Sequence, residues 1–311
     1  MNFYEHIDSN KRRSWVIMIL FMAFITFASY VMIRGLGYSL SYVGIAFIFS
    51  GLMSFASYYF SDQIILGLSG ARPADRKRDF QFYTVTENLA MAAQIPMPKL
   101  YVIEDTAMNA FATGRDPQHA VVCATTGILS RLDRTELEGV IAHELSHVKN
   151  YDIRLMSIVT VLVGLIALIA DGFLRISAFG GRDRDDDNKS SGQLQIIFFV
   201  LGLAFALLSP LIAQLIQMAI SRQREFLADA SGAGITKFPE GLARALEKLA
   251  HDKEPLEAAN KATAHLYIHD PFYHDTPFAN FKGKSAIGLF SSLFSTHPPL
   301  EERIARLRGA K

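Results

Sequence analysis

The stretch GVIAHELSHVKNYD, residues 139–152, is where the fold and the chemistry of this chain meet. His143, Glu144 and His147 fall within about one turn of an expected helix, among apolar neighbours and just before another long apolar run. Residues i and i+4 of a helix share one face, so the two imidazoles can point at the same spot. Buried ionisable groups cost free energy unless a partner satisfies them. The stretch therefore predicts a helix whose buried face carries both histidines, with a partner group bound between them.

The His-Glu-x-x-His spacing is typical of a zinc site. Two neutral histidine nitrogens suit Zn²⁺, and a glutamate directly after the first histidine can take a proton from water beside the metal. The alternative is a pair of ordinary core or surface histidines. Catalytic zinc also needs a third protein ligand and an open position. A third histidine six residues downstream is excluded, because Ile153 holds that position.

A glutamate on a later helix is the other source of a third ligand. The stretch SRQREFLADASG, residues 221–232, offers Glu225, with Asp229 one helical turn further on. Glu225 could bind the metal, while Asp229 could accept the ring N–H of a ligating histidine and fix its tautomer. A solvated, charged helix end is the alternative interpretation. The HELSH motif upstream favours the metal site.

The composition predicts that part of the chain lies in a membrane. The 311 residues are 50% hydrophobic and 20% charged, with a mean hydropathy of +0.20, which is apolar for a water-soluble protein. The formal net charge of +1 offers no basic field for nucleic acid. The single cysteine, Cys123, excludes an intramolecular disulfide and a cysteine-rich zinc site.

The apolar residues are concentrated in four uncharged runs. Residues 14–33 and 35–61 lie close together, so a transmembrane hairpin over residues 1–66 is favoured over a cleavable signal. Residues 155–170 and 190–221 form a second pair. Each of these later runs could be a buried core helix or a hairpin that only dips into lipid, but full spanning is favoured. We expect four hydrophobic, transmembrane helices.

Basic residues flank these runs on one side. By the positive-inside rule they put the amino terminus and the main polar regions in the cytoplasm. The basic flanks are Lys11, Arg12 and Arg13; Arg72, Arg76, Lys77 and Arg78; and Arg222 and Arg224.

The polar part of the chain is predicted to be α+β, mainly helical with a small β-sheet. A helix is expected over 79–93, followed by short strands in KLYVIED, NAFATG and HAVVCAT. Asp133 and Glu136 have capping-box spacing and start a helix that runs to about Asn150. Further helices are expected near 239–251 and 299–308. This polar part consists of residues 72–153 and 222–311, separated by the hydrophobic pair in 154–221.

The four motifs HELSH, EFLAD, NAFATG and STHPPLEERI together resemble the HtpX family of membrane-bound zinc proteases, and more distantly the CAAX prenyl proteases. The resemblance covers nearly the whole chain. It implies a zincin-type metalloprotease domain with one Zn²⁺ per chain. The implied zinc ligands are His143, His147 and Glu225, and the implied catalytic acid/base is Glu144.

The resemblance implies further site residues. The histidine at His297 would face the cleft and stabilise the oxyanion, although a loop residue before two prolines is the alternative. Arg303 would pack behind the site, against Asp229. An edge strand would bind the substrate backbone as an added strand, although Asn109 alone also fits a turn. The residues of this strand are Asn109, Ala110, Phe111 and Ala112.

The implied function is a multi-pass endopeptidase of the bacterial inner membrane, with its active site on the cytoplasmic side. Its partners would be the lipid bilayer and unfolded or misfolded membrane proteins, with no nucleic acid. A prenyl-protein processing protease is one alternative, but that family is usually longer. A non-catalytic zinc-binding membrane scaffold is another alternative. The presence of Glu144 argues against it, because a structural zinc site needs no acid beside its ligand.

Overall fold

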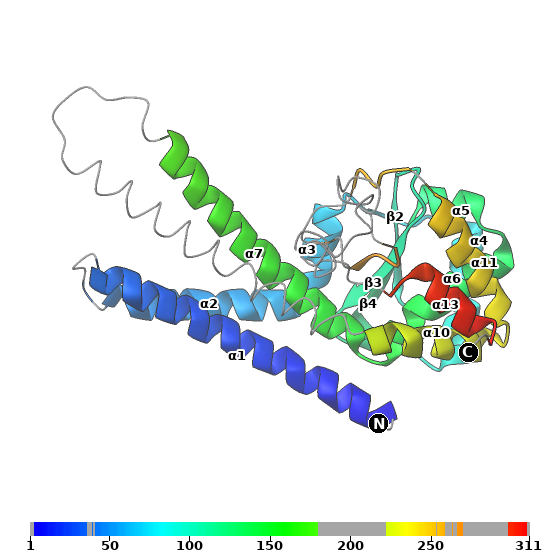
Figure 1. Ribbon diagram of the computed structural model, residues 1–311, viewed down its shortest axis with the longest axis horizontal. Coiled ribbons are helices and arrows are strands. Elements are labelled where there is room, and N and C mark those ends of the chain that lie inside the picture. The colour runs from blue at the N-terminus through cyan, green and yellow to red at the C-terminus, as the bar shows by residue number, and fades with distance from the viewer. Residues whose placement is uncertain are drawn as a thin grey trace, which may run out of the picture.

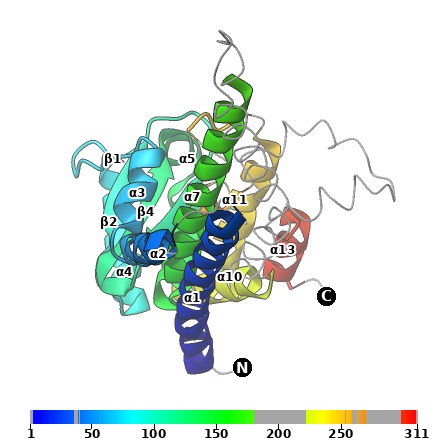
Figure 2. The same ribbon diagram turned by 90° about the vertical axis from the view of Figure 1, so that its left-hand side faces the viewer.

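The computed structural model describes residues 3–35, 39, 41–179, 222–252, 254–258, 263, 266–269 and 298–309. Three long helices, α1 (Phe3–Gly35), α2 (Ser41–Tyr59) and α7 (Asp152–Phe179), pack on one another and project from one side of the molecule (Figure 1). The sheet and the shorter helices form a body on the other side. Figure 2 views the molecule from the side of the projecting helices, with the body behind them.

The body contains a four-stranded mixed sheet in the order β1-β2-β4-β3. Its strands are β1 (Arg72–Pro73), β2 (Lys99–Ile103), β3 (Ala110–Gly114) and β4 (Ala120–Thr125). Strands β2 and β4 are parallel, whereas β1–β2 and β3–β4 are antiparallel. The small predicted sheet is thus confirmed, and β3 forms one of its edges.

Helices cover both faces of this sheet, so strands β3 and β4 are buried along their whole length. On one face Ala112 and Val122 pack with residues of α4 (Phe80–Ala93) and α6 (Arg134–Lys149). On the other face Phe111 and Cys123 pack with α3 (Ser61–Leu68) and the start of α7. Alternate residues of a strand point to opposite faces, which explains why neighbours in sequence belong to different clusters.

Helix α6 lies at the centre of the body. It begins with the predicted capping box, in which the Asp133 carboxylate accepts from the Glu136 N–H at 2.9 Å and the Glu136 carboxylate accepts from the Asp133 N–H at 2.8 Å. Helix α6 contacts α4, α7, α10 (Arg222–Thr236) and α11 (Pro239–His251). The remaining described elements of the body are the 3₁₀ helix η1 (Pro117–His119), α5 (Thr126–Arg131) and α13 (Leu300–Leu307).

The projecting helices contain the first three apolar runs. Ile17 and Phe21 of α1 pack against Leu155 and Ile158 of α7. Other faces of α1 and α2 expose large apolar side chains, among them Trp15, Ile19, Phe27, Ile45, Ile48, Leu52 and Phe55. Among the described residues, one helix, α2, is long and apolar enough to cross a membrane. The fourth run, 190–221, lies outside the described residues, so the four transmembrane helices stay a prediction.

Candidate metal centre

The motif residues of α6 face α10. His143, Glu144 and His147 are all buried, with 1%, 2% and 5% of their surface exposed. Glu225 and Asp229, one turn apart on α10, are buried against them. The structure thus brings together two segments that are about eighty residues apart in the chain.

Gly232 allows α10 to lie this close to α6. A Cβ atom at Gly232 would lie 3.0 Å from the backbone nitrogen of His143 and 3.2 Å from the carbonyl carbon of Ala142. Those atoms belong to a helix backbone, which cannot move aside as a flexible side chain can. A glycine three residues after Asp229 is therefore part of the geometry that brings the two carboxylates to the histidines.

Three side chains converge on one point. The Nε2 atoms of His143 and His147 lie 3.2 Å apart. One carboxylate oxygen of Glu225 lies 3.6 Å from Nε2 of His147, and the other lies 3.8 Å from Nε2 of His143. These ligand atoms all lie within 4.8 Å of one another, close enough for one cation to contact all three residues.

The outer ring nitrogens of both histidines face carboxylates. The Nδ1 atom of His143 lies 2.9 Å from Asp229 Oδ1, and the Nδ1 atom of His147 lies 3.0 Å from Asp152 Oδ2. Carboxylates accept, so each neutral ring carries its proton on Nδ1 and presents the Nε2 lone pair to the centre. Two lone pairs 3.2 Å apart in a buried site repel each other unless a proton or a metal ion lies between them. Two imidazoles and a carboxylate are a donor set that suits Zn²⁺.

The surrounding charges also favour a cation. Burial opposes protonation of His147, but the hydrogen bond with Asp152 and the negative charge of Glu225 outweigh it and raise the pKa of this ring to about 9. Burial raises the pKa of Glu144, and the electrostatic effect of the neighbouring histidines and Arg303 only partly offsets it. The carboxylates therefore make a site that attracts positive charge, whether a proton or a metal ion.

Arg303 forms a buried ion pair with Asp229. Its Nε and Nη2 atoms donate to the two carboxylate oxygens of Asp229, at 2.9 and 2.7 Å, and the side chain is fully buried. Burial alone would raise the pKa of Asp229, but the charge of Arg303 and the bond to His143 hold this pKa at about 2. Asp229 is thus an ionised acceptor, aligned on one side by Arg303 and bonded on the other to His143.

Asp152 was missed by sequence reasoning. It is the first residue of α7, five positions after His147, where no helical periodicity pairs the two residues. The chain turns between α6 and α7 at Tyr151, whose φ of 59° lies in the left-handed region. This sharp turn brings Asp152 back to the ring of His147. The signal available in the sequence was an acid three residues before an apolar run, which is too common to be specific.

The strand expected to bind the substrate, β3, lies at the sheet edge, but its first residue and the one before it already form hydrogen bonds with residues 268 and 269. Asn109 donates through Nδ2 to the carbonyl of His269 at 3.0 Å, and the carbonyl of Ala110 accepts from the N–H of Ile268 at 3.0 Å. Phe111 packs its ring edge-on against Tyr267 in the core. The next residue whose main chain points to the outer edge is Ala112, because alternate residues of an antiparallel strand bond to the same side. The expected oxyanion residue, His297, lies outside the described residues.

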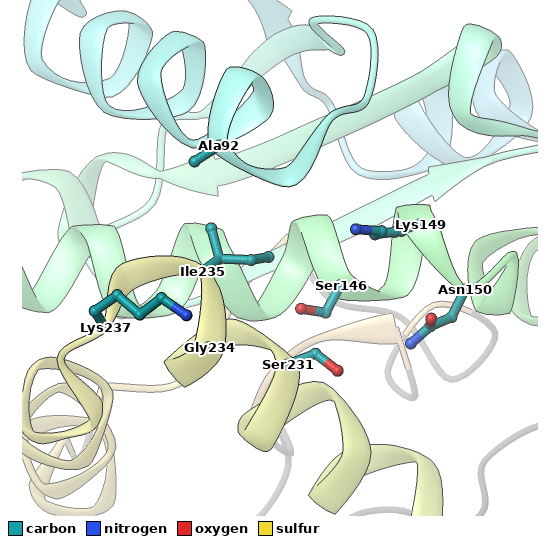
Figure 3. A pocket seen from close by; sticks show the side chains of 8 residues that line it. All are labelled: Ala92, Ser146, Lys149, Asn150, Ser231, Gly234, Ile235 and Lys237. Atoms are coloured by element: carbon teal, nitrogen blue, oxygen red, sulfur yellow. The ribbon is translucent and has the colours of Figure 1, made fainter. Parts of the chain in front are cut away.

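A cavity of about 530 Å³ lies beside the centre, between α4, α6 and α10 (Figure 3). None of the three converging ligand residues lines it. The side chain of Asn150, at the end of α6, points into it. The cavity is lined by Ala92, Ser146, Lys149, Asn150, Ser231, Gly234, Ile235 and Lys237. It is therefore separate from the point between the two histidines.

Known proteins are similar to this chain over nearly its whole length. The sequence model for Peptidase family M48 matches residues 76–311. A "Protease HtpX homolog" of Dictyoglomus turgidum is 45% identical over 308 residues, which cover 98% of this chain and 94% of that protein. A "Protease HtpX homolog" of Streptococcus uberis is 38% identical over 309 residues, 98% of this chain and 99% of that protein. The crystal structure of S. mikatae Ste24p aligns with a TM-score of 0.49 at 19% identity, over 98% of this chain and 67% of that one.

Proposed function

Because the chain belongs to the HtpX proteases of Peptidase family M48, we propose that it is a zinc-dependent endopeptidase that cleaves misfolded or damaged membrane proteins at the cytoplasmic face of a bacterial inner membrane. It is a metallopeptidase, as its family establishes. The observation that carries the zinc assignment is the convergence of His143, His147 and Glu225, with both Nε2 atoms turned inward.

Each histidine ligand would be oriented by a neighbouring carboxylate. His143 and His147 would bind through Nε2, oriented by Asp229 and Asp152 at their Nδ1 atoms. Glu225 would complete the protein ligands and leave a position open. When bound, zinc supplies Lewis acidity, which lowers the pKa of water and polarises a carbonyl group.

Glu144 would move the protons of the reaction. It follows a ligand directly on α6, and its raised pKa suits a carboxylate that first accepts a proton from the attacking water and then passes it to the leaving amine. His297 would donate a hydrogen bond to the oxyanion. Hydrolysis of this kind needs no serine or cysteine nucleophile, which agrees with the burial of Cys123 in the sheet.

The edge of β3 would hold the substrate. Ala110 already bonds within the chain, so an extended peptide would pair with the outward main-chain groups of Ala112. Main-chain pairing is independent of side chains, and an unfolded segment of almost any sequence can make it. This mode of binding supports misfolded proteins as the substrate class.

The membrane part of the proposal rests on the exposed apolar surface of the projecting helices. An apolar surface of this extent on α1 and α2 is unfavourable in water and favourable in lipid. We propose that the runs in 1–66 and 154–221 form two transmembrane pairs, with both parts of the protease domain, 72–153 and 222–311, in the cytoplasm. The basic flanks of the runs support this orientation.

The proposal is tested with full-length protein in detergent, stripped by a chelator and reloaded with zinc. Cleavage of an unfolded membrane protein is followed for wild type, Glu144→Gln and the control Glu138→Gln, a residue of the same helix that pairs with Arg134. Glu144→Gln should lower the rate by at least about a hundredfold and still bind zinc, whereas Glu138→Gln should cleave like wild type.

Two outcomes would overturn the proposal. Zinc bound one to one without cleavage by wild type would favour the scaffold. Cleavage restricted to prenylated peptides would favour the prenyl-protein processing protease.

A further inference from the structure

Asn10, in the first hydrophobic helix, lies in a buried polar cluster next to the metal centre. It is 3% exposed, although it lies among the polar residues that precede the apolar run. Its Nδ2 group donates to Asp152 Oδ1 at 2.7 Å and to the carbonyl of Asn150 at 3.0 Å. Its Oδ1 accepts from Nη1 of Arg224 at 3.3 Å. The amide of Asn10 therefore uses both of its hydrogens and its oxygen.

The orientation of this amide follows from its partners. Arg224 can only donate, so it must face the oxygen of Asn10. The carbonyl of Asn150 and the carboxylate of Asp152 can only accept here, so they must face the NH₂ group. A leucine or alanine at position 10 could make none of these three bonds.

Both parts of the metal centre adjoin this cluster. Asp152 uses its other oxygen, Oδ2, to hold the Nδ1 atom of His147. Arg224 directly precedes Glu225 at the start of α10. Asn10 thus bonds one residue that orients a proposed ligand and another that adjoins a second proposed ligand.

The register of α1 on α7 sets the place of Asn10. Asn10, Ser14, Ile17 and Phe21 form one buried stripe at helical spacing. The apolar members of the stripe pack on α7, the helix that begins with Asp152. The neighbouring residue Lys11 places its ammonium group 4.5 Å from the ring centre of Tyr151, in the turn before Asp152. Two adjacent residues of α1 therefore contact the turn that carries Asp152.

We propose that Asn10 is a positioning residue of the metal centre, through which the packing of the first hydrophobic helix controls zinc affinity. The inference rests on the proposed zinc site. Asn10 holds Asp152 in the position from which its Oδ2 fixes the tautomer and ring orientation of His147. Without Asn10, Arg224 attracts Asp152 directly, since Nη1 of Arg224 already lies 3.9 Å from Oδ1 of Asp152. The carboxylate then turns away from the ring.

The experiment measures zinc affinity by competition with a chromophoric chelator, on full-length protein in detergent. Asn10→Ala removes the amide. Ser14→Ala is the matched control, because Ser14 lies on the same buried stripe and, among the described residues, its hydroxyl donates within its own helix, to the carbonyl of Asn10. Asp152→Asn and the double variant Asn10→Ala/Asp152→Asn complete a double-mutant cycle.

Asn10→Ala should weaken zinc binding by about tenfold, the lower end of the effect of losing a group bonded to a ligand, because Asn10 acts through Asp152. It should add no further loss in the Asp152→Asn background, because the two residues act in series. Ser14→Ala should bind like wild type. The visible spectrum of the Co²⁺-loaded protein should change in Asn10→Ala and not in Ser14→Ala, which separates an effect on the ligands from a general loss of packing.

Unchanged zinc affinity in Asn10→Ala, or losses that add in the double variant, would overturn the inference. If Asn10→Ala does not fold, Asn10→Asp keeps the shape and replaces the donor that faces Asp152, with the same expected weakening. A wild-type protein that binds no zinc would refute the proposed function as well. A wild type that binds zinc and cleaves, with an Asn10→Ala variant that is no weaker, would refute this inference alone.

Discussion

Replacing Arg303 by methionine should destabilise the protein even when no metal is bound. Methionine is similar in length and fits a buried site, so the main loss is the pair of hydrogen bonds to Asp229 at 2.9 and 2.7 Å. The carboxylate of Asp229 would remain buried without its main partner. The prediction therefore concerns the stability of the fold, separately from catalysis.

The magnitude follows from the burial of the pair. Arg303 is fully buried and Asp229 is 4% exposed, so water cannot replace the lost guanidinium. Removing one partner of a buried ion pair costs about 3 kcal/mol or more. For a chain of this size, that corresponds to a fall in Tm of about 6 °C. Arg303→Lys should lose less, because it keeps the charge but not the two-pronged geometry.

The measurement is a thermal unfolding curve in detergent with excess chelator, so that metal binding does not contribute to Tm. Arg76→Met is the control, because Arg76 forms a 3.3 Å pair with Glu87 between exposed side chains. Such surface pairs contribute about 0.5 kcal/mol or less, so Tm should stay within about 1 °C of wild type. Equal effects of Arg303→Met and Arg76→Met would refute the reasoning that burial makes the Arg303 pair important.

Two further substitutions and one labelling experiment test other parts of the structure. Gly232→Ala should push α10 away from His143 and weaken zinc binding, measured by competition with a chelator. Gly234→Ala is the control, because Gly234 lies on the same helix with open space around it, and it should bind zinc like wild type. Equal affinities of the two variants would show that the close approach of α10 to α6 does not matter for zinc binding. Asp133→Ala removes the cap of α6 and should lower the free energy of unfolding by about 1 kcal/mol in a denaturant titration, with an unchanged value contradicting the capping role. Burial raises the pKa of the Cys123 thiol, so alkylation followed by mass spectrometry should label it only as the protein unfolds, and rapid labelling of the folded protein would contradict that burial.

Local features of the chain predicted much of the fold. Helix α6 begins where the capping box of Asp133 and Glu136 places it, because both partners lie within one turn. The three short strands appear where β-branched and apolar residues lie between turn residues. The convergence of His143 and His147 was also predictable, because helical geometry alone puts residues i and i+4 on one face. The family resemblance then indicated which distant glutamate to expect beside them.

Other features of the same centre could not be predicted locally. Asp152 reaches His147 only because Tyr151 takes a left-handed conformation in the turn between α6 and α7. Asn10 meets Asp152 across 142 residues of sequence, through the packing of α1 on α7. From the sequence alone, an asparagine in a polar flank could be exposed to solvent or bonded to a carboxylate. The residues next to Asn10 and Asp152 in the chain form no pattern that indicates the pairing.

The sequence by itself therefore determined the metal motif, the three longer strands, the main helices of the body and the apolar runs, all of which depend on local patterns of a few residues. Only the tertiary structure decided which carboxylate orients each histidine, how closely α10 approaches α6, and which residue of the first hydrophobic helix lies beside the centre. The physical reason is that a hydrogen bond depends on distance and angle in space. Those are set when separate helices pack together, and the spacing along the chain does not contain them.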